Sequence, residues 1–276
     1  MGYNVNFQYR KFHLGDKLTE EQVAFFNKYG FLHFTDVLPK EEVKAIIESY
    51  YEAQKKLIAD GTTEINGVPL FMGGDIDGSK MIHRFPFFSL HSKPMHEFIT
   101  SGKLKPLLGL IGDYKVRIAE DEKDGVVFNH YVNTPHSKFK QMGWHTDSIR
   151  DLFYDGKVLP MLNIGVYLDD SSEANGGLRI LPGTHTQKLF QLLFKKAYFL
   201  NGKADKNEAL VTAKAGDVVV HHGHLWHRVG QSPFTGEKSR RRVMYIPAIC
   251  GKFIPKNKES KKAFYHKFRP VTKDWF

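Results

Sequence analysis

Cysteine is almost absent from this chain of 276 residues, which contains Cys250 alone. A single cysteine cannot form an internal disulfide, and it excludes a zinc site built from several thiolates. Long apolar runs are also missing, since no stretch approaches the roughly twenty apolar residues needed to cross a bilayer. The first residues hold no apolar signal-peptide core either. We therefore expect a cytoplasmic protein without a membrane partner.

Acidic residues are scarce towards the C-terminus. Residues 236–276 hold 12 Lys and Arg against 3 Asp and Glu, whereas the rest of the chain holds 28 against 27. Nearly all of the net charge of +10, a surplus of +9, therefore resides in the C-terminal part. No regular alternation of arginine with aromatic residues accompanies this charge, which favours a solvated segment over a nucleic-acid partner.

Helical signals dominate the first part of the chain. Apolar residues at 41% and charged residues at 25% exclude disordered, collagen-like and coiled-coil classes. A capping-box pattern starts at Thr19 and Gly30 follows the last apolar position, which predicts a helix over 19–29. Helical spacing predicts a second helix over about 39–61 and a further helical stretch over 94–112.

The second half of the chain changes to strand signals. Residues 61–92 show no sustained period and are predicted to be a long irregular segment. After them, short β-branched and aromatic runs alternate with turn residues. These runs cover 114–119, 125–132, 162–168, 178–181, 210–213, 217–221 and 243–249. Helices followed by many short strands predict a mainly β fold, a jelly roll with N-terminal helices packed on one sheet.

A metal-binding pattern stands at Gly143-Trp144-His145-Thr146-Asp147. Residues two apart in an extended segment project from the same face, so His145 and Asp147 can reach one metal ion. Two histidines and one carboxylate leave positions open on a six-coordinate metal, the arrangement of non-haem Fe(II) oxygenases. Four histidines compete for the remaining ligand position: His221, His222, His224 and His227.

Further motifs surround this pair in a fixed order. The chain reads LTEEQVAFFNKYGFLHF and LPKEEV near its start, then WHTD, ANGGLRILPGTH, AGDVVVHHGHLWH and SRRRVMYI. Together these motifs resemble the phytanoyl-CoA dioxygenase family of Fe(II)- and 2-oxoglutarate-dependent oxygenases, and the likeness covers most of the chain. The resemblance implies a double-stranded β-helix of the cupin kind in a single domain over 1–276. Its helical part would span 19–112, its jelly-roll core 113–250, and its basic segment 251–276.

The resemblance also selects the metal ligands. Family spacing places one histidine five residues after the Asp of the Gly-Asp pair and the ligand five residues further on, which matches His222 and then His227. Iron would therefore be held by His145, Asp147 and His227. His221 and His224 are then expected to pack or to support the ligands.

The cosubstrate 2-oxoglutarate needs a cation for its distal carboxylate, and a guanidinium binds a carboxylate through two parallel hydrogen bonds. Strand alternation places Arg241 on the face opposite Arg240 and Arg242. In similar proteins the cosubstrate arginine opens this strand, which selects Arg241. Three further contacts are expected: Asn129, where such proteins place a side chain against 2-oxoglutarate, and Asn163 and Tyr131, which face inward by alternation.

The implied reaction consumes Fe(II)-bound 2-oxoglutarate and O2, releases succinate and CO2, and hydroxylates an unactivated C–H bond. Halogenating relatives replace the carboxylate ligand with a small residue, so Asp147 favours hydroxylation. A small carboxylate or an amino-acid-like metabolite is the expected substrate. Its contacts are expected from His83 and Arg84 in the irregular segment and from Trp144, with the loops 133–142 and 148–160 around the mouth.

Two alternatives remain open. A jelly roll without catalytic activity could serve as a binding or sensing module, and would not turn over 2-oxoglutarate. A nucleic-acid demethylase drawn to its substrate by the basic segment would bind oligonucleotides with strong salt dependence. The neutral charge of the remaining chain makes this second alternative minor, and the sequence does not indicate an oligomeric state.

Overall fold

The computed structural model describes residues 7, 9–134, 142–149, 158–199 and 201–262. Its α-helices are α1 (Glu20–Tyr29), α2 (Lys40–Ala59), α3 (Lys93–Thr100) and α4 (Leu189–Phe194). Its strands are β1 (Phe31–Phe34), β2 (Glu64–Ile65), β3 (Val68–Pro69), β4 (Phe71–Gly74), β5 (Lys80–Phe85), β6 (Arg117–Ile118), β7 (Val127–Tyr131), β8 (Met142–His145), β9 (Met161–Tyr167), β10 (Leu178–Ile180), β11 (Ala209–Val211), β12 (Val218–His222), β13 (His227–Val229) and β14 (Arg241–Ile249). Short 3-10 turns include η1 (Phe88–His91) and η2 (Lys105–Ile111).

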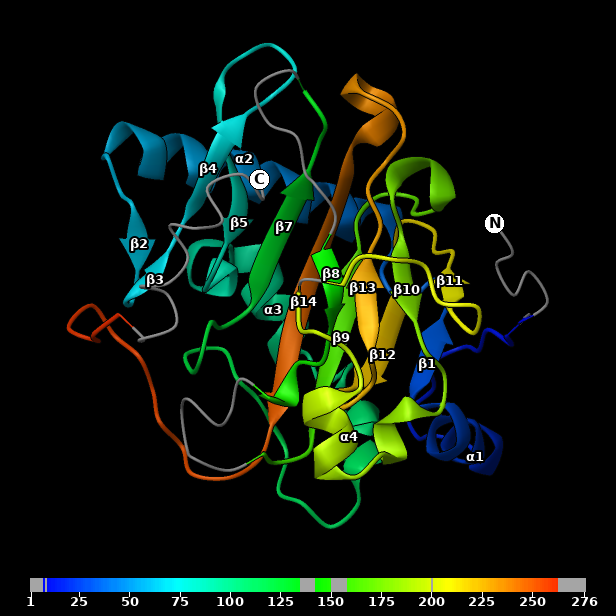
Figure 1. The fold of residues 1–276 in the computed structure, drawn as a ribbon. Coiled ribbons are helices and arrows are strands. Elements are labelled where there is room, and N and C mark those ends of the chain that lie inside the picture. The colour runs from blue at the N-terminus through cyan, green and yellow to red at the C-terminus, as the bar shows by residue number, and fades with distance from the viewer. Residues whose placement is uncertain (1–6, 8, 135–141, 150–157, 200, 263–276) are drawn as a thin grey trace.

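Two antiparallel sheets form the centre of the molecule (Figure 1). The large sheet has the order β1-β12-β9-β14-β7-β5-β4, and β6 also pairs with β14. The small sheet has the order β11-β10-β13-β8. Strands that neighbour each other in a sheet are often far apart in the chain, as expected of a double-stranded β-helix. The predicted jelly roll is confirmed.

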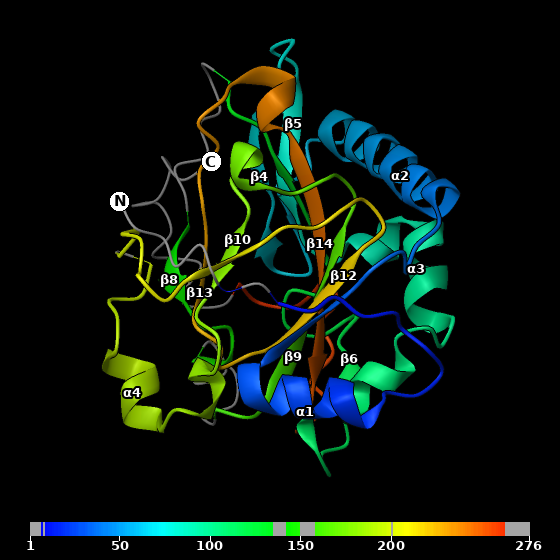
Figure 2. The same cartoon turned by 90° about the vertical axis from the view of Figure 1, so that its right-hand side faces the viewer.

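The helices α2 and α3 cover one side of this sandwich (Figure 2). Figure 2 shows α2 and α3 on the side of the large sheet that faces away from the small sheet. Ile46 and Tyr50 of α2 belong to the same buried cluster as Ile164, Val220 and Ile246 of the large sheet. The ring of Tyr50 stacks on that of Phe128 in β7 at a centroid distance of 4.1 Å. The helices therefore hold the outer face of the large sheet, and its inner face remains for a site between the sheets.

The predicted helices match the structure closely. Thr19 caps α1 with the expected capping box, and Gly30 ends it in a left-handed conformation with φ of 80°. The second helix runs over Lys40–Ala59. The helical stretch predicted over 94–112 divides into α3 and η2, because the chain turns at Gly102, which has φ of 85°.

The prediction of an irregular segment over 61–92 is wrong. It contains β2, β3, β4 and β5, and β5 adds to the large sheet beside β7. The residues of β5 from Met81 to Phe85 are all buried, so the strand lacks the alternation of polar and apolar residues that a half-exposed strand shows. β4 ends in Gly73 and Gly74, and β5 is its one partner among the described strands, so its extended conformation depends on that pairing.

Parts of the predicted mouth cannot be compared with the structure. Residues 135–141, 150–157 and 263–276 lie outside the described residues, and they include most of two predicted loops and half of the basic segment. Among the helices that are described, none combines the length and the apolar composition that crossing a membrane requires.

Candidate metal centre

The small sheet brings the predicted ligands together. His145 ends β8 and His227 begins β13, and these two residues are direct partners in the antiparallel pair. Asp147 follows β8 by two residues, and its backbone N–H donates to the carbonyl of Gly223 at 2.9 Å. An antiparallel pair places the side chains of opposite residues on the same face, so the two imidazoles point to one place.

The three side chains form a compact donor set. One ligand atom from each of His145, Asp147 and His227 lies within 4.8 Å of the other two, and all three residues are buried. Nδ1 of His145 donates to the carbonyl of Gly143 at 2.8 Å, and Nδ1 of His227 donates to that of Leu225 at 2.9 Å. In a neutral imidazole this leaves the lone pair on Nε2, the form that binds a metal.

Burial also favours the neutral form of His227. Its removal from solvent, and then the nearby His145, lower the pKa of His227 well below the ordinary value. Two neutral imidazoles and a carboxylate on one face are the donor set of the non-haem Fe(II) oxygenases, with further positions open for cosubstrate and oxygen. The residues present therefore fit Fe(II).

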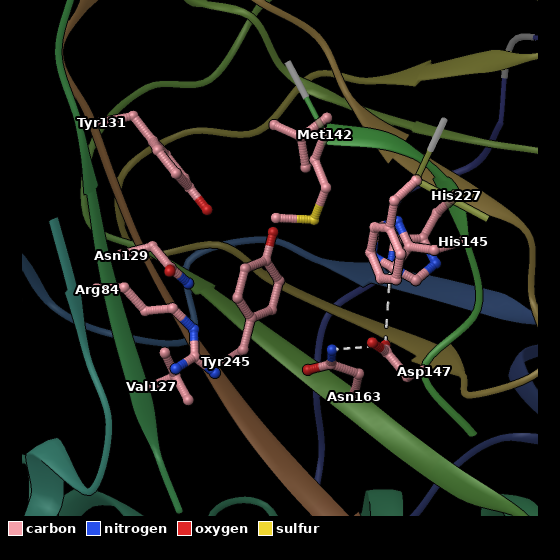
Figure 3. Close-up of a pocket in the computed structure, with 12 residues that line it drawn as sticks. Arg84, Val127, Asn129, Tyr131, Met142, His145, Asp147, Asn163, His227 and Tyr245 are labelled. Carbon is pink, nitrogen blue, oxygen red and sulfur yellow. Dashed lines mark hydrogen bonds and ion pairs between the residues drawn. The ribbon is translucent and has the colours of Figure 1, made fainter. Parts of the chain in front are cut away.

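Two side chains outside the candidate ligands contact the carboxylate of Asp147. Nδ2 of Asn163 donates to Oδ2 of Asp147 at 2.8 Å (Figure 3). Nε2 of His221 lies 3.2 Å from the same oxygen. Asn163 was expected to contact 2-oxoglutarate, and its amide nitrogen is instead engaged with the carboxylate ligand. Its Oδ1 is buried and has no hydrogen-bond partner among the described residues.

A cavity of about 130 Å³ adjoins the three candidate ligands. Figure 3 draws Arg84, Val127 and Asn129 on one side of it and the donor set on the other. The lining residues that the structure describes are Arg84, Val127, Asn129, Tyr131, Met142, His145, Asp147, Asn163, Phe199, His227, Val229 and Tyr245. Of the predicted contacts, Arg84, Asn129, Tyr131 and Asn163 thus reach the cavity.

Two predicted substrate contacts do not line the cavity. The indole N–H of Trp144 donates to the carbonyl of Lys203 at 2.9 Å, and its ring packs in a buried cluster with Leu181 and Trp226. His83 is buried as well, and its Nδ1 lies 2.7 Å from the carbonyl of His130. Trp144 alternates with His145 along β8 and so faces away from the metal ligands.

Arg241 differs from the two arginines beside it. It is 1% exposed, and its Nε and both Nη atoms have no hydrogen-bond partner among the described residues. Its guanidinium carbon lies 4.7 Å from the ring centre of Tyr131, which lines the cavity. By contrast, Arg240 pairs with Asp75 and Glu237, and Arg242 pairs with Asp169.

A buried hydroxyl accompanies this unpaired guanidinium. Tyr167 ends β9, which pairs with β14, and it lies opposite Val243 on the same inner face as Arg241. Its hydroxyl has no hydrogen-bond partner in the part of the chain that is described. Burial raises the pKa of Tyr167, while Arg241 acts in the opposite direction. Buried polar groups are normally hydrogen-bonded, and a buried charge without a partner is costly. The orphaned donors of Arg241 and Tyr167 therefore fit a carboxylate ligand such as the distal end of 2-oxoglutarate.

The cavity also contains residues that the sequence did not identify. Phe199 stacks on His145 at a centroid distance of 4.8 Å and is 37% exposed, and Met142 also lines the cavity. No periodic pattern surrounds Phe199, which has a left-handed φ of 58°. Tyr245 shares the inner face with Arg241, so strand alternation could have added it to the candidates.

The sequence matches the phytanoyl-CoA dioxygenase family over residues 26–241. A probable alpha-ketoglutarate-dependent hypophosphite dioxygenase from Stutzerimonas stutzeri is 25% identical over 237 residues, which cover 82% of this chain and 77% of the relative. The family match includes β8, β13 and all three candidate metal ligands.

Solved structures of similar fold include an alpha-ketoglutarate-dependent carbocyclase and a protein with 2-oxoglutarate bound. The carbocyclase SnoK of nogalamycin biosynthesis superposes with a TM-score of 0.62 at 14% identity, covering 95% of this chain and 94% of SnoK. HygX from Streptomyces hygroscopicus, solved with nickel and 2-oxoglutarate, gives a TM-score of 0.59 at 17% identity, covering 87% and 90%. The family match over most of the chain, together with a donor set suited to iron, shows that this protein belongs to the phytanoyl-CoA dioxygenase family and is an Fe(II)- and 2-oxoglutarate-dependent dioxygenase.

Proposed function

We propose that this dioxygenase hydroxylates an unactivated C–H bond of a small metabolite, a carboxylate or an amino-acid-like molecule. In the balanced reaction the substrate C–H bond, 2-oxoglutarate and O2 give the C–OH product, succinate and CO2. The observation that carries the proposal is the small cavity beside the three candidate ligands, which Arg84 also lines. Fe(II) supplies the activation of oxygen, and the residues of the chain bind and orient the reactants.

The inner face of the large sheet provides the cosubstrate site. We assign Fe(II) to His145, Asp147 and His227, and the distal carboxylate of 2-oxoglutarate to Arg241 and the hydroxyl of Tyr167. Arg241 pairs with Tyr131 across β14 and β7, and Asn129 lies two residues along the same face. Tyr131 and Asn129 would therefore border the bound cosubstrate.

Cavity size supports a small substrate. The volume of about 130 Å³ is near that of an engineered cavity of about 150 Å³ that holds one benzene molecule. Drug-sized ligands occupy pockets of about 300–1,000 Å³. The relative from Stutzerimonas stutzeri is named for hypophosphite, a very small anion, which is consistent with a compact substrate. Epimerase and carbocyclase neighbours show that this fold also supports other outcomes of C–H oxidation.

Arg84 is the residue that favours an anionic substrate. It pairs with Asn129 across β5 and β7, so the two guanidiniums of Arg84 and Arg241 lie on the same face, one on each side of β7. Nη2 of Arg84 donates to Oδ2 of Asp124 at 2.7 Å, while its Nη1 has no partner among the described residues. Arg241 is assigned to the cosubstrate, so Arg84 remains to bind a carboxylate of the substrate.

Anaerobic titration of the metal-free protein with Fe(II) and 2-oxoglutarate tests the proposed site. A visible charge-transfer band should appear and should be absent from Asp147→Ala. Succinate formation is then measured with small carboxylates, amino acids and hypophosphite, and the product is identified by mass spectrometry. A folded protein with no band and no succinate would instead be a jelly-roll binding module. Turnover that needs an oligonucleotide would favour the demethylase alternative.

Replacing Arg84 should separate substrate binding from cosubstrate binding. Arg84→Met is expected to weaken the apparent affinity for the stimulating anion by about 10- to 100-fold, because a hydrogen bond to a charged group contributes roughly 1.5–3 kcal/mol. The apparent affinity for the cosubstrate should stay unchanged, and steady-state kinetics with each reactant varied in turn measures both. Amide analogues of the same size serve as neutral controls and should lose little affinity in the variant. A weakened affinity for the cosubstrate alone would assign Arg84 to 2-oxoglutarate.

A further inference from the structure

His221 is a buried histidine beside the metal centre that is not one of the proposed ligands. It lies near the end of β12, directly opposite Asn163 of β9, and is 1% exposed. Its ring centre lies 4.7 Å from that of His227. Its Nε2 lies 3.2 Å from Oδ2 of Asp147, the oxygen that also accepts from Asn163. Asn163 and His221, which project from the adjacent strands β9 and β12, therefore contact the same carboxylate oxygen.

Hydrogen bonding distinguishes His221 from the two candidate imidazole ligands. An ionised carboxylate only accepts hydrogen bonds, so Nε2 of His221 must carry the proton in its contact with Asp147. In His145 and His227 the proton is on Nδ1, which donates to a backbone carbonyl. Their Nε2 atoms therefore carry lone pairs, whereas Nε2 of His221 is a donor. His221 thus differs in its chemical role from His145 and His227, which share one role.

We propose that His221 is a positioning residue that acts through Asp147 and thereby sets the metal affinity of the site. The same segment also holds the backbone of the ligand loop, because the carbonyl of Gly223 accepts from the N–H groups of Asp147 and Ser148 at 2.9 and 3.1 Å. Gly223 permits this close approach, since a Cβ there would lie 2.3 Å from Oγ of Ser148. The end of β12 therefore orients both the backbone and the carboxylate of Asp147.

Loss of the His221 donor should leave the carboxylate less restrained before the metal arrives. Partners of this kind fix the orientation of a ligand, and their loss typically weakens metal binding by about 10- to 100-fold. The side chain of Asn163 would still donate to Oδ2 of Asp147, so metal binding should be weakened and not abolished. The inference rests on the metal site proposed above, and its readout is metal binding without turnover.

The test is Mn(II) affinity, measured from the electron paramagnetic resonance signal of free Mn(II) in the absence of 2-oxoglutarate. His221→Phe keeps a buried ring but removes the donor, and it should weaken Mn(II) binding by about 10- to 100-fold. His221→Gln keeps an N–H donor at similar reach and should restore most of the affinity. Should the phenylalanine variant fail to fold, His221→Met gives an unbranched apolar comparison for His221→Gln.

His222→Phe is the matched control. His222 is the next residue on β12, and its ring lies near Phe26 and His185, away from Asp147. This variant should bind Mn(II) like the wild-type protein. The inference is overturned if folded His221→Phe binds Mn(II) with wild-type affinity, or if His221→Gln loses as much as the apolar variants. A wild-type protein that binds no Mn(II) would instead overturn the metal site itself.

Discussion

Asp147→Ala is expected to abolish 2-oxoglutarate turnover and to weaken Mn(II) and Fe(II) binding by more than about 100-fold. Loss of a residue that only supports a metal ligand weakens metal binding by about 10- to 100-fold, and loss of a ligand itself is expected to weaken it more. Asp147 supplies the only negative charge among the three candidate ligands, and the two imidazoles left behind are neutral donors. Succinate formation and the resonance signal of free Mn(II) measure the two effects.

Two further variants separate charge from shape at this position. Asp147→Asn keeps the size of the side chain and an oxygen that can accept from Asn163 and His221, so it should fold like the wild-type protein and still bind metal poorly. Asp169→Ala removes a carboxylate that pairs with Arg242 outside the cavity, and it should retain wild-type metal affinity. Metal binding by Asp147→Ala within tenfold of wild type would contradict the assignment of the triad.

Part of the metal centre could be predicted from the sequence because two of its candidate ligands are close together in the chain. Residues two apart in an extended segment share a face whatever the rest of the fold, so His145 and Asp147 could be paired without a structure. Local spacing could not identify the remaining ligand, because four histidines occur within seven residues. Family spacing selected His227, and the register of β8 and β13 places it opposite His145.

Strand alternation was equally informative for Arg241 and less so for Asn163. Alternation predicts which side of a sheet a residue faces, and Arg241 and Asn163 both face inward as expected. It does not predict which partner a side chain meets there. The partner of Asn163 comes from the pairing of β9 with β12, which brings His221 alongside, and from the loop that returns Asp147 to this point. Such contacts depend on register over long sequence separations.

The strands that the sequence did not reveal are those whose order depends on their neighbours. β13 is three residues long and lies between β10 and β8 in the small sheet. Its residues His227, Arg228 and Val229 are all buried, so no alternation of polar and apolar residues marks them as a strand. Phe199 reaches the cavity from a loop with a left-handed backbone, which no propensity predicts.

Arg241→Met is expected to raise the 2-oxoglutarate requirement by about 100-fold or more while leaving the free protein at least as stable as wild type. A carboxylate bound by two charge-assisted hydrogen bonds contributes roughly 3 kcal/mol or more, which corresponds to this loss of affinity. The stability of the free protein should not fall, because the guanidinium of Arg241 is buried there without a hydrogen-bond partner among the described residues. An uncompensated buried charge destabilises a fold by several kcal/mol, so an apolar side chain of similar length relieves that cost.

Thermal unfolding with and without 2-oxoglutarate, in the presence of Mn(II), measures both effects in one experiment. Wild type should gain stability on adding 2-oxoglutarate, because a ligand that binds only the native state stabilises it, and Arg241→Met should gain little. Arg242→Met is the matched control, since that guanidinium pairs with Asp169 on the other side of the strand. It should lose stability in the free protein and keep its response to 2-oxoglutarate. If the response disappears in Arg242→Met and persists in Arg241→Met, the cosubstrate arginine is on the opposite face and the assignment is wrong.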